Sequence, residues 1–195
     1  MVDLCGQPLI DWTLEATRLW PVPVNVVVAT DDSAIANRGK AYGAEIIGLT
    51  KDDLEDRRTG SELWKSVAAD RDGVHILMEN TAPFRLREDL IAGWEMFESG
   101  KFDLVRGVLK IRFWLFDAAG RPEVPLKETT VLSQHRQPRF HPTGSFYIAN
   151  SDYLRRCENI NEGRVGLVPV NEVSAIDIDN PTDLQTARLA ARCFR

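Results

Sequence analysis

The segment that decides the fold reads Val24-Asn-Val-Val-Val-Ala-Thr30, Asp31-Asp32-Ser33, Ala34-Ile-Ala-Asn-Arg-Gly-Lys-Ala-Tyr42, Gly43 and Ala44-Glu-Ile-Ile47. Its β-branched run is typical of a strand buried on both faces of a parallel sheet. The aspartates and serine after it can cap a helix, and Gly43 ends that helix before a second short strand. This strand–helix–strand order predicts an α/β fold, in which ligands bind beyond the carboxyl ends of the strands.

The other elements are predicted from periodicity and turn residues. Helices are expected over 8–19, 61–69, 87–98, 151–157 and 182–192, and strands over 74–78, 102–108, 144–149 and 165–170. A polar, charged loop is expected over 51–59.

The sequence pattern changes after residue 108 and predicts an antiparallel hairpin. Its strands are expected over 109–117 and 124–132, with a turn at 118–122 and a basic connector over 134–142. The apolar side chains Phe113, Trp114 and Phe116 favour either a contact with a second subunit or ordinary packing under the hairpin.

Composition bounds the class of protein. A chain of 195 residues with 44% hydrophobic content can bury a substantial core, most simply as one domain. The net charge of -5 argues against binding nucleic acid or an anionic membrane surface. No apolar run is long enough for a membrane span, and the first residues lack the pattern of a signal peptide. The widely spaced Cys5, Cys157 and Cys193 indicate neither a disulfide framework nor a zinc site and favour a reducing, cytoplasmic setting.

Polar residues follow two of the predicted strands. The turn Thr59-Gly60-Ser61 at a helix start offers hydroxyl and backbone donors to an anion or a base, although a solvated loop is the simpler interpretation. Another strand end carries Glu79, Thr81 and Arg85. No nucleophile motif such as Gly-x-Ser-x-Gly, zinc motif such as His-Glu-x-x-His, or Gly-x-Gly-x-x-Gly loop is present.

A pair of carboxylates lies near the end of the chain, in Ser174-Ala-Ile-Asp-Ile-Asp-Asn-Pro-Thr-Asp-Leu-Gln185. A strand there would put Asp177 and Asp179 on one face and the neighbouring isoleucines in the core. Two carboxylates on one face can bind a hard cation such as Mg²⁺, although the same pattern is common in surface loops. Asn180 is a good N-cap and Pro181 a good first residue for the helix that follows.

Five motifs occur in a familiar order along essentially the whole chain. They are Gly6-Gln-Pro-Leu-Ile10, Val27-Val-Ala-Thr-Asp-Asp32 with Ile35-Ala36 and Tyr42-Gly-Ala-Glu45, Thr81-Ala-Pro-Phe-Arg85, Gly144-Ser-Phe-Tyr-Ile148 and Ile176-Asp-Ile-Asp-Asn-Pro-Thr-Asp-Leu184. Together they resemble the acylneuraminate and CMP-KDO cytidylyltransferase family, the CMP-sugar synthetases. The resemblance implies a Rossmann-like, mostly parallel sheet flanked by helices, of the nucleotide-diphospho-sugar transferase type. It also implies a single domain over 1–195, with 109–143 as a β-hairpin extension for dimerisation and substrate closure.

Members of this family transfer CMP from CTP to an acidic sugar and release pyrophosphate. The resemblance therefore implies CTP and a nonulosonic acid, such as a sialic acid, as substrates of a cytoplasmic homodimer. It implies Mg²⁺ as cofactor, with Asp177 and Asp179 as catalytic metal ligands, and a nucleotide contact at Ser61. Sugar contacts are expected at Glu79, Tyr147 and Arg136, the last at a position where the family can use an arginine of a second subunit.

The sequence departs from the family pattern in three ways. The family carries a strand and a basic Gly/Ser loop for the triphosphate ahead of the first motif. Because the sequence begins after that position, we expect either a fragment of an enzyme or a non-catalytic relative. Glu79 replaces a glutamine of the sialic-acid enzymes, which is unfavourable beside an acidic sugar unless the carboxyl is protonated or the substrate differs. Their paired aromatic residues are replaced by the polar stretch 159–163.

Overall fold

The computed structural model describes residues 1–50, 53, 59–113, 115–123 and 131–194. Most of the loop predicted at 51–59 and of the strand predicted at 124–132 therefore lies outside the described residues, and so does Trp114.

The deciding segment forms a parallel strand pair joined by a helix, as predicted. β3 (Val27–Thr30) pairs with β4 (Glu45–Gly48), and α2 (Ser33–Ala41) connects them. The side chain of Asp32 caps α2 by accepting hydrogen bonds from the backbone N–H groups of Ala34 and Ile35, at 2.7 and 3.0 Å. The strand begins three residues later than predicted. α1 (Leu9–Ala16) packs beside α2, where Asp11 pairs with Arg38, and continues into the 3₁₀ turn η1 (Thr17–Leu19).

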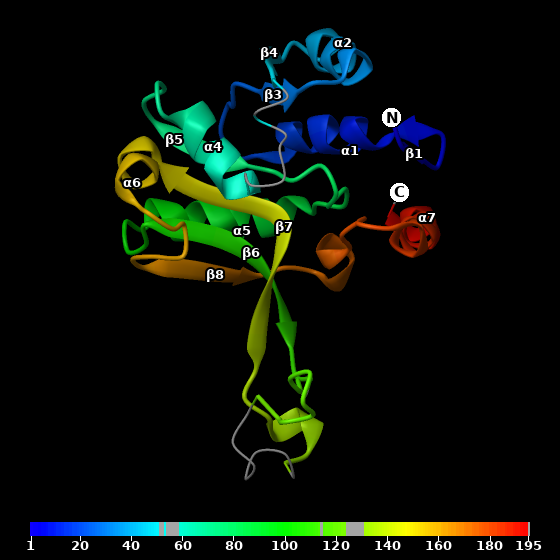
Figure 1. Ribbon diagram of the computed structural model, residues 1–195, viewed down its shortest axis with the longest axis vertical. Helices are drawn as coiled ribbons and strands as arrows, with labels where there is room; N and C mark the ends of the chain where they lie inside the picture. The colour runs from blue at the N-terminus through cyan, green and yellow to red at the C-terminus, as the bar shows by residue number, and fades with distance from the viewer. Residues whose placement is uncertain (51–52, 54–58, 114, 124–130, 195) are drawn as a thin grey trace.

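A four-stranded sheet forms the larger part of the molecule (Figure 1). Its strand order is β5 (Val74–Leu77), β7 (Arg139–Asn150), β6 (Leu104–Ile111) and β8 (Val165–Pro169). The pairing of β6 with β8 is parallel, whereas β7 runs antiparallel to both β5 and β6. The α/β prediction is confirmed. The sheet is mixed because β7 is antiparallel to both of its neighbours, whereas β6 and β8 are parallel.

Helices cover both faces of this sheet. α5 (Arg87–Glu98) lies on the face to which Phe146 and Ile148 point, in a core cluster with Leu90. α4 (Gly60–Ala68) and α6 (Ser151–Arg156) lie on the opposite face, where Tyr147 packs with Trp64 and Tyr153. The alternation of neighbouring β7 residues between two cores follows from the period of two in a strand.

An arm extends away from the sheet (Figure 1). It is the continuation of β6 and β7, which pair from Val108 opposite Pro142 to Ile111 opposite Arg139. The predicted turn at 118–122 is present, because Phe116 and Pro122 form an antiparallel bridge around it. The predicted pairing is wrong for residues 109–111, which pair with 139–141 of β7, and most of the strand predicted at 124–132 lies outside the described residues. The predicted connector 134–142 is also wrong, since β7 already begins at Arg139. Among the described residues of this arm, five large apolar side chains are exposed, namely Phe113, Leu115, Phe116, Leu132 and Phe140.

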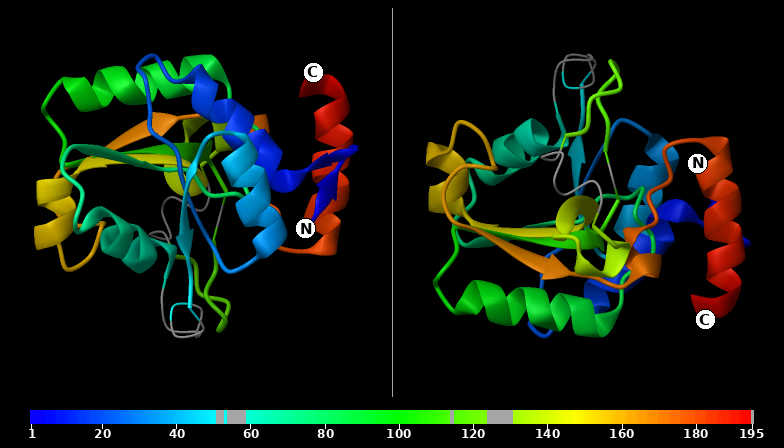
Figure 2. Two further views of the ribbon diagram at one scale, coloured as in Figure 1. Left: turned by 90° about the horizontal axis from the view of Figure 1, so that it is seen from above. Right: turned by 90° about the horizontal axis from the view of Figure 1, so that it is seen from below.

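The C-terminal segment packs beside the N-terminus (Figure 2). After the 3₁₀ turn η4 (Glu172–Ala175), the chain passes through Asp177 and Asp179 into α7 (Pro181–Phe194). α7 contacts β1 (Asp3–Leu4), which forms a small hairpin with β2 (Gln7–Pro8). The predicted N-cap is confirmed, because the Asn180 side chain accepts hydrogen bonds from the backbone of two residues of the first turn.

The strand predicted at Asp177 and Asp179 is wrong. Residues 176–178 have no regular secondary structure, and Ile178 makes one backbone hydrogen bond, from its N–H to the carbonyl oxygen of Thr81 at 2.9 Å. A single backbone hydrogen bond does not form a strand pair, so residues 176–178 are a connector that leads to α7. Ile176 and Ile178 do pack into a core cluster, as predicted. None of the helices in the described part of the chain has the length and apolar character that crossing a membrane requires.

Candidate active site

A group of four side chains meets where β5 ends. Glu79 follows β5, and its N–H donates to the carbonyl oxygen of Gly144 at 3.0 Å. Tyr147 lies opposite Leu77 in the register of β5 and β7, with its hydroxyl beside the Glu79 carboxyl. Asp177 and Asp179 lie close enough to act electrostatically on Glu79. Four of the six residues predicted for the site are thus brought together.

Gly144 makes room for Glu79. Its φ of +68° lies in the region that favours glycine, and a Cβ atom there would stand 2.5 Å from Oε2 of Glu79. A residue with any side chain at position 144 would therefore push the Glu79 carboxyl out of its place.

The electrostatics of the group favour less negative charge than three carboxylates would carry. Burial, followed by the charge of Asp177, raises the pKa of Glu79, and the nearby Tyr147 and Arg85 oppose this only in part. Burial and the neighbouring Glu79 raise the pKa of Tyr147 to about 12, so its hydroxyl stays protonated and can donate. A cation bound here would relieve the repulsion between the carboxylates.

The site has an unsatisfied acceptor that fits a metal ion. Oδ1 of Asp177 is buried and has no hydrogen-bond partner among the described residues, and the same holds for Oδ1 of Asn80. Such atoms are rare because an unpaired buried acceptor costs free energy. No cluster of three or more His, Cys, Asp or Glu that could hold a metal occurs in the described ranges. Mg²⁺ commonly uses one or two protein carboxylates and completes its shell with water and phosphate, so the pair Asp177 and Asp179 fits this ion.

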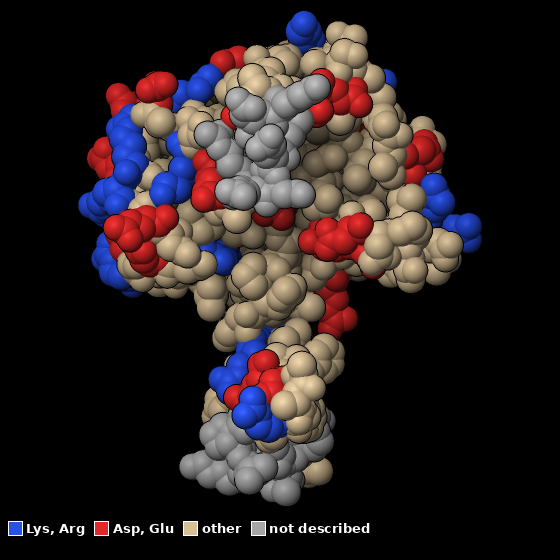
Figure 3. Space-filling view, viewed as in Figure 1, with Lys and Arg blue, Asp and Glu red and all other residues tan. Residues whose placement is uncertain are grey.

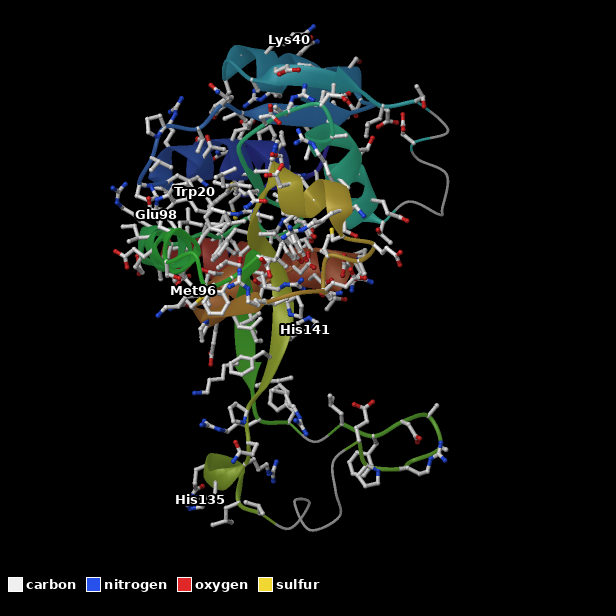
Figure 4. All side chains as sticks on the ribbon, turned by 90° about the vertical axis from the view of Figure 1, so that its left-hand side faces the viewer. Trp20, Lys40, Met96, Glu98, His135 and His141 are labelled. Carbon is white, nitrogen blue, oxygen red and sulfur yellow. The ribbon has the colours of Figure 1, made fainter. Side chains whose placement is uncertain are left out.

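Ser61 and Arg136 do not join this group. Ser61 lies in the first turn of α4, where its hydroxyl is 2.8 Å from that of the capping Thr59. Arg136 lies in the arm, and its guanidinium donates to the carbonyl oxygens of Val131 and Arg112 at 2.9 and 3.3 Å. Figure 4 labels His135, the residue before it, near the far end of the arm. Arg136 is therefore not part of the Glu79 group within one copy of the chain.

Arg85 lies next to the group, and all three of its side-chain nitrogens donate hydrogen bonds. It donates from Nε to the carbonyl oxygen of Ser145 at 2.7 Å, from Nη1 to Oγ1 of Thr13 at 3.2 Å and from Nη2 to the carbonyl oxygen of Glu79 at 2.6 Å. Burial lowers the pKa of Arg85 to about 9. These contacts tie the loop that carries Glu79 to β7 and α1.

A cavity of about 860 Å³ opens beside the group, between β3 and β5. Its walls are mainly apolar residues of β3, β5, α1 and α4, and at one end it reaches Glu79, Asn80 and Thr81. Figure 3 shows a recess in this face of the molecule with acidic side chains at its border. The volume lies within the range of small-molecule sites.

Sequence reasoning missed Asn80, Arg106 and Asn161. Asn80 lies in the strand-end loop already singled out, but an amide next to a glutamate carries no signal of its own. Arg106 did carry one, because it is a charged residue inside the apolar run Leu104–Val108 of β6. Asn161 lies in the polar stretch 159–163, and its contact with Arg106 depends on tertiary structure.

An acidic group at the strand ends of an α/β sheet, beside a cavity of small-molecule size, is a typical place for ligand binding in this fold class. A family model described as cytidylyltransferase matches residues 1–112, and the chain belongs to that family. The family-level resemblance drawn from the sequence is thereby confirmed.

Known proteins similar to this chain agree with that assignment. An N-acylneuraminate cytidylyltransferase of Escherichia coli is 23% identical over 202 residues, covering 94% of this chain and 46% of that protein. The chain thus spans about half the length of this curated relative.

Two solved structures share the fold. A CMP:2-keto-3-deoxy-manno-octonic acid synthetase complexed with CTP has a TM-score of 0.68 at 15% identity, covering 98% of this chain and 90% of that one. A 2-C-methyl-D-erythritol 4-phosphate cytidylyltransferase of Thermus thermophilus has a TM-score of 0.67 at 19% identity, with 97% and 92% covered.

Proposed function

We propose that this chain carries the catalytic core of an enzyme that transfers CMP from CTP to an acidic sugar and releases pyrophosphate. Its family supports cytidylyl transfer, and the name of the curated relative supports an acylneuraminate-like acceptor. The observation that carries the proposal is Oδ1 of Asp177, which is buried beside Glu79 and Tyr147 and has no hydrogen-bond partner among the described residues. A cation bound to this oxygen would lie where the sugar and the phosphate would meet.

In the proposed reaction, the anomeric hydroxyl oxygen of the acceptor forms a bond to the α-phosphorus of CTP. The bond from that phosphorus to the bridging oxygen breaks, pyrophosphate leaves, and the hydroxyl proton is released. Asp177 and Asp179 would hold Mg²⁺, which when bound neutralises phosphate charge and acidifies the hydroxyl. Ser61 would contact the nucleotide at the start of α4.

Glu79 and Tyr147 would contact the sugar. The raised pKa of Glu79 supports this role, since a carboxyl that is more readily protonated repels an acidic acceptor less. Tyr147 keeps its proton and would donate a hydrogen bond to a sugar oxygen.

The arm would pair two copies of the chain in the cytoplasm. Its exposed apolar residues, such as Phe113 at 69% and Leu132 at 64%, support burial against a second subunit. In such a dimer, Arg136 of one copy would contact the sugar in the site of the other.

A second function is a non-catalytic dimeric module that keeps the fold. One observation favours it: among the described residues that line the cavity, Arg71 and His75 are the basic ones. Arg71 is already paired with Glu45 at 2.5 Å. These residues alone offer little charge to a triphosphate.

Pyrophosphate release separates the two functions. The chain is incubated with CTP, Mg²⁺ and a panel of nonulosonic acids, and we expect release that depends on one of the acids. Well-folded protein that releases no pyrophosphate with any acid would exclude the enzymatic proposal and leave the binding module.

A further inference from the structure

A buried arginine, Arg106, lies on the strand that flanks Tyr147 on the side away from Glu79, and it has no part in the site described so far. Arg106 of β6 lies opposite Tyr147 of β7 and is 6% exposed. Its guanidinium carbon is 5.2 Å from the centre of the Tyr147 ring, a cation–π contact. Directly after Arg106, the pairing of β6 with β7 becomes irregular. Such irregularities re-aim side chains and are frequent beside active sites.

Most donors of Arg106 have no partner among the described residues. A guanidinium has five N–H donors, and in Arg106 one nitrogen, Nη2, donates a hydrogen bond to Oδ1 of Asn161 at 2.7 Å. Its Nε is buried without a hydrogen-bond partner among the described residues. No carboxylate of the described chain forms an ion pair with it either. A buried charge without an anion is costly, so the position calls for an anion from outside the chain.

The loop beside Arg106 is fixed in place. The hydroxyl of Tyr153 lies 2.9 Å from the carbonyl oxygens of both Ile160 and Glu162, on either side of Asn161. The N–H of Asn161 donates to Oδ1 of Asn159 at 2.8 Å. Asn161 is therefore held on both sides and orients the guanidinium of Arg106, so that its remaining donors are preorganised for a ligand.

We infer that Arg106, oriented by Asn161 and stacked on Tyr147, receives the carboxylate of the acceptor and thereby selects an acid over a neutral sugar. This inference rests on the proposed function, because it names how the same site chooses its acceptor. Strands two places apart are separated by about 10 Å. An acceptor lying along Tyr147 would thus reach both the Glu79 end of the site and Arg106. Arg136 of the same chain makes its hydrogen bonds within the arm, which leaves Arg106 as the arginine beside Tyr147.

The first test observes Arg106 directly in the wild-type chain. The side-chain Nε–H resonance of Arg106, assigned by its loss in Arg106→Lys, is followed by NMR during titration with N-acetylneuraminic acid and with its uncharged methyl ester. We expect the acid to shift this resonance and the ester to leave it in place. No shift with the acid, or equal shifts with both, would overturn the inference.

The second test compares affinities for the acid and the ester. In Arg106→Met the preference for the acid should fall about 10-fold or more, because a charge-assisted pair is lost. Arg106→Lys should keep part of that preference. Arg164→Met is the matched control, since Arg164 is exposed and paired with Asp103 at 3.0 Å. An unchanged preference in Arg106→Met would contradict the inference.

Binding of CTP with Mg²⁺ is measured in parallel, so that the two proposals fail separately. If the wild type binds CTP but Arg106 does not respond to the acid, the inferred subsite is wrong and cytidylyl transfer stands. If Arg106 responds to the acid but CTP does not bind, the subsite is supported and the proposed function is wrong.

Discussion

Arg85 and Arg106 are both buried, and both lie next to the group formed by Glu79 and Tyr147, yet their hydrogen bonds differ. Arg85 donates from all three nitrogens to acceptors of the chain itself. Arg106 donates from one, and its Nε has no partner in the described part of the chain. Burial lowers the pKa of both residues, so burial does not distinguish them. The number of unpaired donors does distinguish them. Arg85 connects the segments of the site through its hydrogen bonds, whereas Arg106 has donors available to bind a ligand.

The largest effect is expected when Arg85 is removed. Arg85→Met leaves the carbonyl oxygens of Glu79 and Ser145 and the hydroxyl of Thr13 without their donor. At about 1–3 kcal/mol for each buried group left unsatisfied, the free energy of unfolding should fall by about 3 kcal/mol or more. Urea unfolding followed by circular dichroism measures this loss.

The matched variant Arg106→Met tests the other half of the comparison. It removes one hydrogen bond and an uncompensated buried charge, so the free energy of unfolding should change by less than about 1 kcal/mol. If Arg106→Met proved more destabilising than Arg85→Met, the assignment of structural and ligand-binding roles would be reversed.

An effect smaller than that of Arg85→Met is expected at Gly144, whose backbone lies against the Glu79 carboxyl. Gly144→Ala places a Cβ against Oε2 of Glu79 and should cost about 1–3 kcal/mol. Gly100→Ala is the control, because Gly100 has a φ of +67° with no atom within 4 Å of such a Cβ. The difference between the two variants in urea unfolding isolates the clash with Glu79. Equal losses would show that the Glu79 carboxyl is not confined there.

The smallest effect is expected at Asn161. Asn161→Ala removes one hydrogen bond that orients Arg106, so the preference for N-acetylneuraminic acid over its methyl ester should fall about 2- to 10-fold. Glu158→Ala, at an exposed position of the same loop, should leave the preference unchanged. Competition binding measures both, and a larger loss in Asn161→Ala than in Arg106→Met would mean that Asn161 itself holds the carboxylate.

The sequence allowed most of the elements to be predicted, because each carries local signals. The helix at 87–98 and the capping residues Asp32 and Asn180 follow from periodicity and capping rules that act within a few residues. The arm could not be predicted correctly, since its pairing joins Ile111 to Arg139 across 28 residues and competes with a local hairpin pattern.

The candidate site shows the same division between local and long-range information. Asp177 and Asp179 could be selected from their spacing, but the strand proposed for them was wrong because no neighbouring strand pairs with that connector. The grouping with Glu79 and Tyr147 joins three separate segments, namely the loop after β5, β7 itself and the connector before α7. Arg106 was passed over, since only its missing partners distinguish it from an arginine that the fold itself satisfies.

The metal site at Asp177 and Asp179 is tested most directly by calorimetric titration of CTP into the protein, with Mg²⁺ and with EDTA. We expect Mg²⁺ to strengthen the binding of CTP to the wild type, and we expect this dependence to disappear in Asp177→Asn and Asp179→Asn. Both variants should unfold at or above the wild-type temperature, since each removes negative charge beside Glu79. Binding of CTP that depends on Mg²⁺ equally in the wild type and in both variants would contradict a metal site at these aspartates.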